Sequence, residues 1–121
     1  MSYEGLKRKI ILFDHFLESQ NPIYDEVLKE LRNGHKETHW MWFIFPQLQG
    51  LGSSAMSVKF AIKDSSEAEQ YWQHPILGPR LRECFEIVQN HTIKPRAIFS
   101  SIDYLKYKSS YQLFSPWMNQ A

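Results

Sequence analysis

Apolar residues recur along this chain mainly at intervals of three and four, the spacing that places side chains on one face of an α-helix. A first helix is predicted over residues 6–16, and Leu17 continues its apolar face. A second helix is predicted between Asn21 and Gly34, because Pro22 suits the first helical position and a glycine suits the position after the last turn.

The segment 38–48 is apolar on nearly every side, so the strand repeat and the helix repeat cannot be told apart within it. We expect a helix that ends at Pro46, because helices are predicted on both sides and no partner strand is apparent. The elements predicted after it are helices from Ser53 or Ser54 to Ile62, from Ser65 or Ser66 to His74 and from Gly78-Pro79 onward, a turn from Pro95 to Phe99, and a last helix capped by Ser100 or Ser101.

Together these elements predict an all-α protein, built as a single compact bundle of about six or seven short helices over residues 1–121. A length of 121 residues is typical of one domain. Apolar residues make up 43% of the chain and aromatic residues 15%, which is enough to build a core without disulfides. The single cysteine, Cys84, falls on the apolar face of its helix and is expected to be a buried, unreactive thiol.

The charge of the chain limits the partners that we expect. A net charge of +1 provides no strong field, which argues against binding to nucleic acid or to an anionic membrane. No apolar run approaches the length of a membrane span, and one cysteine cannot support a secreted disulfide scaffold. No signal peptide is recognisable, so we expect a cytoplasmic location.

The most distinctive motif is His-Trp-Met-Trp-Phe-Ile-Phe-Pro-Gln-Leu at residues 39–48, followed by Gly-Leu-Gly-Ser-Ser-Ala-Met at 50–56. Other motifs are Asn-Pro-Ile-Tyr at 21–24, His-Pro-Ile-Leu-Gly-Pro-Arg-Leu at 74–81, and a last block that runs from Ile98-Phe99 through Asp103, Lys106 and Ser109-Ser110 to Leu113-Phe114. In order and spacing, these motifs resemble the bacterial family known as domain of unknown function 1810, over residues 13–114. The resemblance implies an all-helical fold and brings no established function with it.

Two properties of that family bear on this chain. Some members carry a calpastatin label, but an inhibitor of that kind is disordered and polar, whereas a chain this rich in Trp, Phe and Leu is expected to fold. Family domains usually continue beyond the last Leu-Phe into a further helix, while this chain ends at Ala121, soon after Trp117-Met118. The resemblance therefore implies either a shortened version of the domain or a different ending. A missing last helix would leave apolar surface exposed and favour self-association through the C-terminal region.

The segment 39–47 contains the first candidate binding site. If this segment is helical, His39 and Trp42 share a face, and their rings could stack against a planar ligand such as a nucleobase. Gln47 would then read the polar edges of the ligand, because its amide offers both a donor and an acceptor. The alternative is that the aromatic side chains form the core and that His39 bonds a backbone carbonyl.

Two further candidates lie at predicted helix starts. Gly52 and Ser53 precede a helix whose N-terminus favours an anion, although the signal is weak and a plain turn with a cap is the preferred interpretation. The other candidate is His74 with Arg80, two predicted ligand-binding residues. Arg80 falls in the first turn of the helix that follows His74, where the helix dipole disfavours a cation. Such an arginine calls for an anionic partner, either a ligand or a carboxylate of this chain.

The last candidate is a polar cluster on the C-terminal helix. Asp103 and Lys106 are three residues apart and are expected to pair with each other. Lys106 also shares a face with Ser110, and a desolvated lysine could activate that serine as a nucleophile. The catalytic candidates are therefore His39, Asp103 and Lys106, while a solvated Asp–Lys pair is the plainer interpretation.

A metal site is not expected, and no cofactor is predicted. His35 and His39 have the spacing of two helical zinc ligands, but Glu37 lies one position later than the glutamate of the His-Glu-x-x-His protease motif. A third ligand would have to come from His74, Cys84 or His91.

Two classes of function remain open. The first is a protein that binds a small nucleotide-like or other anionic, planar ligand and, if it is an enzyme, acts as a hydrolase or transferase. It predicts that His39, Gln47, Arg80 and Asp103 converge on one pocket. The second is a non-enzymatic protein–protein interaction module, which predicts an exposed apolar patch and self-association.

Overall fold

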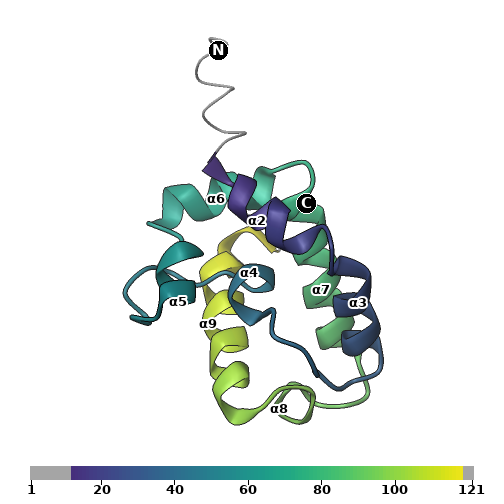
Figure 1. Cartoon of the computed structure of the whole chain (residues 1–121). Helices are drawn as coiled ribbons and strands as arrows, with labels where there is room; N and C mark the ends of the chain where they lie inside the picture. The colour runs from purple at the N-terminus through teal and green to yellow at the C-terminus, as the bar shows by residue number, and fades with distance from the viewer. Residues whose placement is uncertain (1–11, 119–121) are drawn as a thin grey trace.

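A computed structural model describes residues 12–118 of the chain, and eight helices make up the fold of this part (Figure 1). In chain order they are α2 (Asp14–Gln20), α3 (Tyr24–Arg32), α4 (Met41–Ile44), α5 (Ala55–Lys59), α6 (Ser65–Gln73), α7 (Leu77–Asn90), α8 (Pro95–Ile98) and α9 (Ser101–Met118). The all-α prediction is confirmed. The number exceeds six or seven because the segment from Pro95 to Phe99, expected as a turn, contains the short helix α8. Most of the helix predicted over 6–16 lies outside the described residues.

The two longest helices, α7 and α9, form the centre of the molecule, and the shorter helices pack around them (Figure 1). Helix α6 contacts both α7 and α9, α3 lies along α7, and α2 packs on α4. Helices α4 and α8 in turn rest on α9. Within residues 12–118, no helix combines the length and apolar character needed to cross a membrane.

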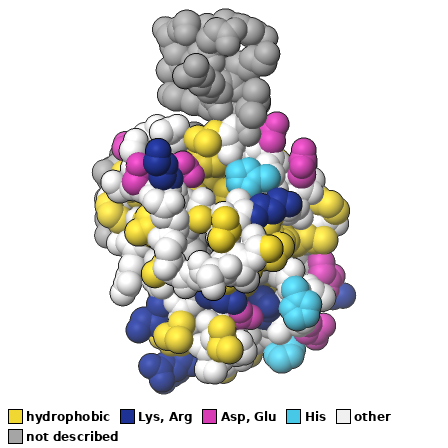
Figure 2. Space-filling view, turned by 60° about the vertical axis from the view of Figure 1, so that its left-hand side comes forward, with side chains coloured by type: hydrophobic (Ala, Val, Ile, Leu, Met, Phe, Trp, Pro, Cys, Tyr) yellow, Lys and Arg dark blue, Asp and Glu magenta, His cyan; other side chains and the backbone are white. Residues whose placement is uncertain are grey.

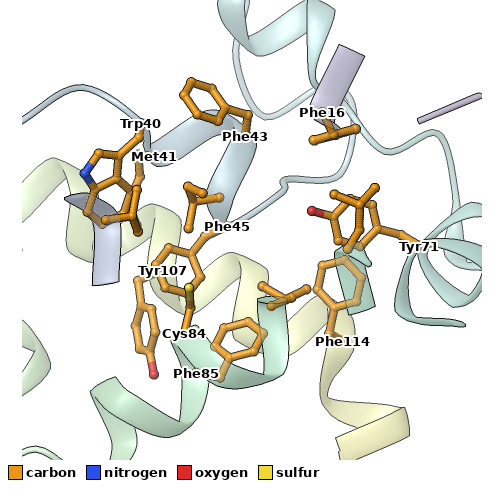
Figure 3. Close-up of a cluster of buried hydrophobic side chains, with 14 of the residues drawn as sticks. Phe16, Trp40, Met41, Phe43, Phe45, Tyr71, Cys84, Phe85, Tyr107 and Phe114 are labelled. Carbon is orange, nitrogen blue, oxygen red and sulfur yellow. The ribbon is translucent and has the colours of Figure 1, made fainter. Parts of the chain in front are cut away.

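The core is built mainly from aromatic rings. Phe45 lies at its centre, with ring centroids 5.2 Å from Phe85, 5.3 Å from Tyr107 and 5.9 Å from Phe99 (Figure 3). A second group links Phe16, Tyr71 and Phe114 from α2, α6 and α9. Edge-to-face and tilted contacts of this kind add to the apolar area that each ring buries. The aromatic share of the sequence is therefore used largely to join the helices.

Several predicted helix ends are confirmed. The Ser54 hydroxyl accepts a 3.2 Å hydrogen bond from the Ser57 amide at the start of α5, and the Ser100 hydroxyl accepts one of the same length from the Asp103 amide. Gly34, after α3, has a φ of 72° that favours glycine. These ends depend on neighbouring residues only, which is why the sequence indicates them.

Three helix starts differ from the prediction. Helix α3 begins at Tyr24 instead of directly after Asn21, and Asp64 caps α6 in place of a serine. Helix α7 begins at Leu77, ahead of the Gly78-Pro79 pair. It starts there because Nδ1 of His74 accepts hydrogen bonds from the amides of Ile76 and Leu77, which satisfies backbone donors at the helix N-terminus.

The helix expected from residue 38 to Pro46 is wrong in extent, because only Met41–Ile44 is helical. Residues after Phe45 are extended, and Leu48 forms an isolated parallel bridge with Ile62. The amide of Ile62 donates to the carbonyl of Gln47 over 2.8 Å, and the amide of Gln49 donates to the carbonyl of Ile62 over 2.7 Å. Beyond Pro46, where the helix was expected to end, the chain thus forms a short extended pairing with a distant segment.

Candidate functional site

A pocket of about 240 Å³ lies between α4, α5 and the first half of α9. Buried residues of 40–43 form its floor, and its other lining side chains are those of Lys36, His39, Trp42, Met56, Asp103 and Lys106. We call it the lysine–tryptophan pocket. Below the middle of the view in Figure 2, basic side chains (dark blue) and acidic side chains (magenta) lie next to each other, and hydrophobic side chains (yellow) lie above and below this group.

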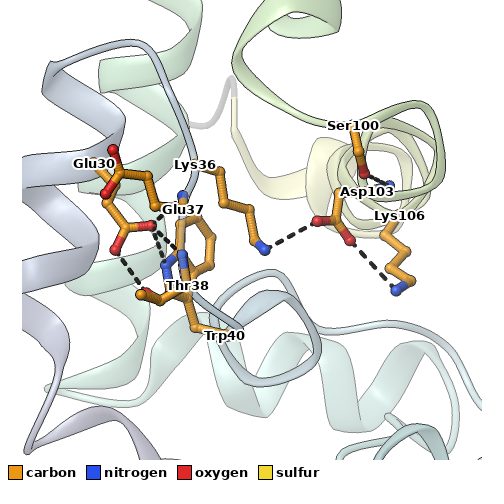
Figure 4. A network of polar contacts seen from close by, with 8 residues as sticks. All are labelled: Glu30, Lys36, Glu37, Thr38, Trp40, Ser100, Asp103 and Lys106. Carbon is orange, nitrogen blue, oxygen red and sulfur yellow. Dashed lines mark hydrogen bonds and ion pairs between the residues drawn. The ribbon is translucent and has the colours of Figure 1, made fainter.

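Asp103 connects two lysines across this pocket (Figure 4). One carboxylate oxygen lies 3.0 Å from Nζ of Lys36, and the other lies 3.4 Å from Nζ of Lys106. Lys36 is the more buried partner, with 8% of its side chain exposed. The pairing of Asp103 with Lys106 confirms that prediction, whereas the contact with Lys36 was not expected from the sequence.

Each of the two ammonium groups also lies over an indole ring. Nζ of Lys36 is 5.0 Å from the ring centroid of Trp40, and Nζ of Lys106 is 4.5 Å from that of Trp42. The negative face of an indole stabilises a cation in this position. Trp40 is buried, whereas Trp42 is half-buried and forms a wall of the pocket.

Glu30 holds the loop that carries the pocket residues (Figure 4). Its carboxylate, in α3, accepts hydrogen bonds from the amides of Glu37 and Thr38, the Thr38 hydroxyl and Nε1 of Trp40. Burial would raise the pKa of Glu30, but these hydrogen bonds hold it at about 2. The sequence reasoning missed Glu30. Its position three residues after Val27, on the apolar face of the helix, was the available signal.

The backbone of this loop is also tied to α8, because the Lys36 amide donates a 3.0 Å hydrogen bond to the carbonyl of Ile98. Together with the Glu30 contacts, this bond fixes the loop at both ends. Because hydrogen bonds to its backbone hold this loop, the Lys36 ammonium has a fixed position next to Asp103.

Gln47 lies beneath the pocket and does not line it. Its side chain is buried, and Nε2 donates to the carbonyls of Phe45 and Lys106 over 2.9 and 2.7 Å. With both amide donors used in this way, Gln47 attaches the backbone of α9 to the segment after α4. It positions Lys106, and its predicted contact with a ligand edge is not supported by this placement.

His74 and Arg80 lie outside the pocket. His74 lies between α6 and α7, with its ring centroid 6.1 Å from that of Phe13, and Arg80 lies where α7 meets α3. The His74 ring caps α7, and burial lowers its pKa. The Arg80 guanidinium lies 4.8 Å from the ring centroid of Tyr24 and donates a 3.3 Å hydrogen bond to Oε1 of Gln20. It forms no ion pair with any residue between 12 and 118.

The predicted convergence is therefore met by two of its four residues, His39 and Asp103. Gly52 lies beside the pocket, where an added Cβ would come within 3.2 Å of the Trp42 ring. Ser53 is exposed in the loop before α5. Residue type alone does not separate the residues that meet from those that do not.

The nucleophile pairing considered for Lys106 and Ser110 is not supported by the geometry. Ser110 is fully buried, and its hydroxyl has no hydrogen-bond partner within the described range. Lys106 is instead engaged with Asp103 and Trp42. A serine sealed in the core is not accessible to a substrate.

No three His, Cys, Asp or Glu side chains between residues 12 and 118 are grouped so that they could hold a metal ion. Cys84 is buried in α7, and its burial raises the pKa of the thiol to about 12. The thiol is therefore protonated at neutral pH, as expected for a structural cysteine.

Comparison with known proteins identifies relatives of this chain. Residues 11–121 match the family described as "Protein of unknown function (DUF1810)". No curated protein matches the chain. The crystal structure of the conserved hypothetical protein Rv1873 from Mycobacterium tuberculosis is similar, with 46% identity and a TM-score of 0.83 over 86% of this chain and 75% of that one. The chain belongs to the DUF1810 family.

Proposed function

We propose that this protein binds a small, anionic ligand with a planar group in the lysine–tryptophan pocket. One observation carries the proposal: a single carboxylate, Asp103, is shared by two ammonium groups. The two lysines and one aspartate that line the pocket leave one positive charge without a counter-ion. An anion bound there would supply it.

The burial of Lys36 strengthens this argument. A surface lysine is neutralised by water and salt at little cost, but Lys36 has only 8% of its side chain exposed. Keeping a charge at such a position is costly unless it is paired, and its partner Asp103 is also engaged by Lys106. Each ammonium retains donors beyond the one aimed at Asp103, and these point to an anionic group as the ligand.

The planar part of the ligand is suggested by Trp42 and His39. Trp42 is half-buried, His39 is exposed, and both rings line the pocket. A flat group placed against an indole gains stacking as well as apolar contact. The volume of about 240 Å³ suits a compound smaller than most drug-sized ligands, or one part of a larger compound such as a nucleotide.

The test is a thermal-shift and calorimetric screen with AMP, ADP, ADP-ribose and ribose 5-phosphate. A ligand at one hundred times its Kd stabilises a protein by roughly 2.7 kcal/mol, which raises the melting temperature by several degrees. The Lys106→Met variant keeps the side-chain stem and the Lys36–Asp103 pair but removes one ammonium group. We expect it to lose most of the shift.

Lys108→Met is the matched control, because Lys108 lies on the same helix, is exposed and does not line the pocket. It should bind as the parent protein does. The proposal is wrong if no compound shifts the melting temperature of a folded sample, or if both variants lose binding equally.

A hydrolase or transferase activity at this site would rest on His39. Imidazoles are common general acids and bases, and this one is exposed at the mouth of the pocket. For any compound that binds, we expect His39→Gln to retain affinity but to lose turnover of that compound. Chromatography of the products measures the turnover. Unchanged turnover in the variant would exclude His39 from the chemistry.

A further inference from the structure

A second and larger groove is lined by residues of α6, α7 and the C-terminal half of α9. Its volume is about 660 Å³, within the range of ligand pockets, and it shares no lining residue with the lysine–tryptophan pocket. Its main lining side chains are Trp72, Arg82, Phe85, Glu86, Tyr111 and Trp117, and we call it the arginine groove.

The aromatic walls of this groove are held by the core. Trp72 and Phe85 are 7% and 4% exposed, so only their edges reach the groove. Phe85 packs edge-to-face against Tyr111 with ring centroids 5.4 Å apart. The ring centroid of Phe114, which is labelled in Figure 3, lies 5.9 Å from that of Trp72 and 6.4 Å from that of Trp117. Because buried neighbours brace these rings, the groove needs little rearrangement to accept another ring.

Arg82 provides a fixed cation next to these rings. Its guanidinium lies 4.7 Å from the ring centroid of Trp72, and one nitrogen donates a 3.1 Å hydrogen bond to the Trp72 carbonyl. These two contacts hold the planar group in place and leave other N–H donors available.

Glu86 does not neutralise this arginine. It lies four residues after Arg82 on α7, a spacing at which ion pairs often form. Arg82 and Glu86 form no such pair. The two ion pairs found within residues 12–118 are those that Asp103 makes with Lys36 and Lys106. Arg82 and Glu86 thus both line the groove without pairing with each other.

We propose that the arginine groove binds an aromatic carboxylate, such as the aromatic C-terminal residue of a peptide. The ring would lie among Phe85, Tyr111 and Trp117, and the carboxylate would pair with Arg82. Glu86 lies one helical turn after Arg82 on α7, so its charge repels the carboxylate and weakens its binding. Rigid aromatic walls with an adjacent guanidinium match both parts of such a ligand.

The test uses N-acetyl-L-phenylalanine, which combines an aromatic ring with a free carboxylate. The four tryptophans give four indole N–H signals in a nitrogen-15 NMR spectrum, and they divide evenly between the two sites. Millimolar probe should shift the signals of Trp72 and Trp117 and leave those of Trp40 and Trp42 unchanged. This result is independent of any ligand in the lysine–tryptophan pocket.

Two further probes separate the chemical parts of the ligand. N-acetyl-L-phenylalaninamide lacks the carboxylate, and N-acetyl-L-alanine lacks the ring. Both should bind at least roughly tenfold more weakly, the effect expected for one charge-assisted hydrogen bond or one ring contact. Equal binding of either compound, or no shift at Trp72 and Trp117 with the acetylated phenylalanine, would overturn the proposal.

Variants assign the carboxylate to Arg82. Arg82→Met should weaken probe binding by roughly tenfold, and Glu86→Gln should strengthen it by a few-fold because it removes a repulsive charge. Arg96→Met is the matched control, since Arg96 lies 5.1 Å over the ring of Tyr104 and outside the groove. A loss of binding in the control, or unchanged binding in both groove variants, contradicts the assignment.

Discussion

The indole nitrogen of Trp40 donates a 3.0 Å hydrogen bond to the same Glu30 oxygen that accepts the amides of Glu37 and Thr38. A single buried carboxylate therefore shapes the loop between α3 and α4. Two other residues of this loop, Lys36 and His39, line the lysine–tryptophan pocket. The relationship between Glu30 and Trp40 thus couples the stability of the fold to the geometry of the site.

We expect Glu30→Gln to lower the free energy of unfolding by roughly 2–4 kcal/mol, because a buried amide cannot replace an acceptor of four hydrogen bonds. Urea denaturation followed by circular dichroism measures the loss. Glu26→Gln, on the exposed face of the same helix, should change stability by no more than about 0.5 kcal/mol. Similar losses in the two variants would show that the Glu30 contacts are not stabilising.

The same carboxylate predicts a pH dependence. The pKa of Glu30 is about 2 in the folded protein, against an ordinary value of 4.5. Its contribution is complete above pH 4.5 and is lost as the pH falls through about 2, and the difference in pKa corresponds to roughly 3 kcal/mol. The stability of Glu30→Gln should therefore fall less steeply over this range than that of the parent protein. Parallel curves from acid titrations would contradict this.

Asp103→Asn should separate folding from anion binding. The variant leaves Lys36 and Lys106 without a carboxylate, so we expect a loss of roughly 1–3 kcal/mol in stability. The pocket gains a second unpaired positive charge, and the affinity for an anionic compound found in the screen should rise roughly tenfold. Isothermal titration calorimetry measures the change, with Asp25→Asn on the exposed face of α3 as control. Weaker binding in Asp103→Asn would argue against an anion site.

Gly78 and Gly50 should respond differently to alanine. A Cβ on Gly78 would overlap the backbone carbonyl oxygen of Trp72, at the contact between α6 and α7. We expect Gly78→Ala to cost about 3 kcal/mol or more, because backbone on both sides must shift. Gly50 has a φ of 88° and open space around it, so Gly50→Ala should cost only about 1–2 kcal/mol of backbone strain. Thermal melts of both variants provide the comparison, and equal costs would contradict the packing argument.

His74→Asn should remove a second pH dependence while preserving the helix cap. Burial, aided by the charge of Arg80, lowers the pKa of His74 below 6.5, so its stabilising effect is present above pH 6.5 and is lost on acidification. An asparagine oxygen can accept the amides of Ile76 and Leu77 without becoming charged. The variant should match the parent protein at pH 8 and lose less stability below pH 6.5. Exposed His35→Asn is the control, and a large loss at pH 8 would contradict the prediction.

Local signals in the sequence predicted local structure well. The caps made by Ser54 and Ser100, the glycine after α3, the turn at Pro95 and the Asp103–Lys106 pair all depend on residues within one helical turn. At that range the chain geometry fixes which groups meet, whatever the rest of the molecule does. The repeated apolar spacing likewise established an all-α fold.

The segment 38–48 marks where such signals end. Its composition allowed either a helix or a strand, and the outcome depended on Glu30, which holds the loop before Trp40, and on Ile62, which pairs with the extended part. Neither partner can be identified from the segment itself, because both approach it through the packing of other helices.

The sequence by itself determined the helical class, several helix ends and the residue types from which a site could be built. Only the tertiary structure decided which of those residues meet. Lys36, from the other half of the chain, pairs with Asp103. Gln47 instead bonds backbone carbonyls, and Arg80 contacts Gln20 and Tyr24. The reason is physical: the spacing of residues sets which face of a helix they occupy, but the packing of the helices sets what that face meets.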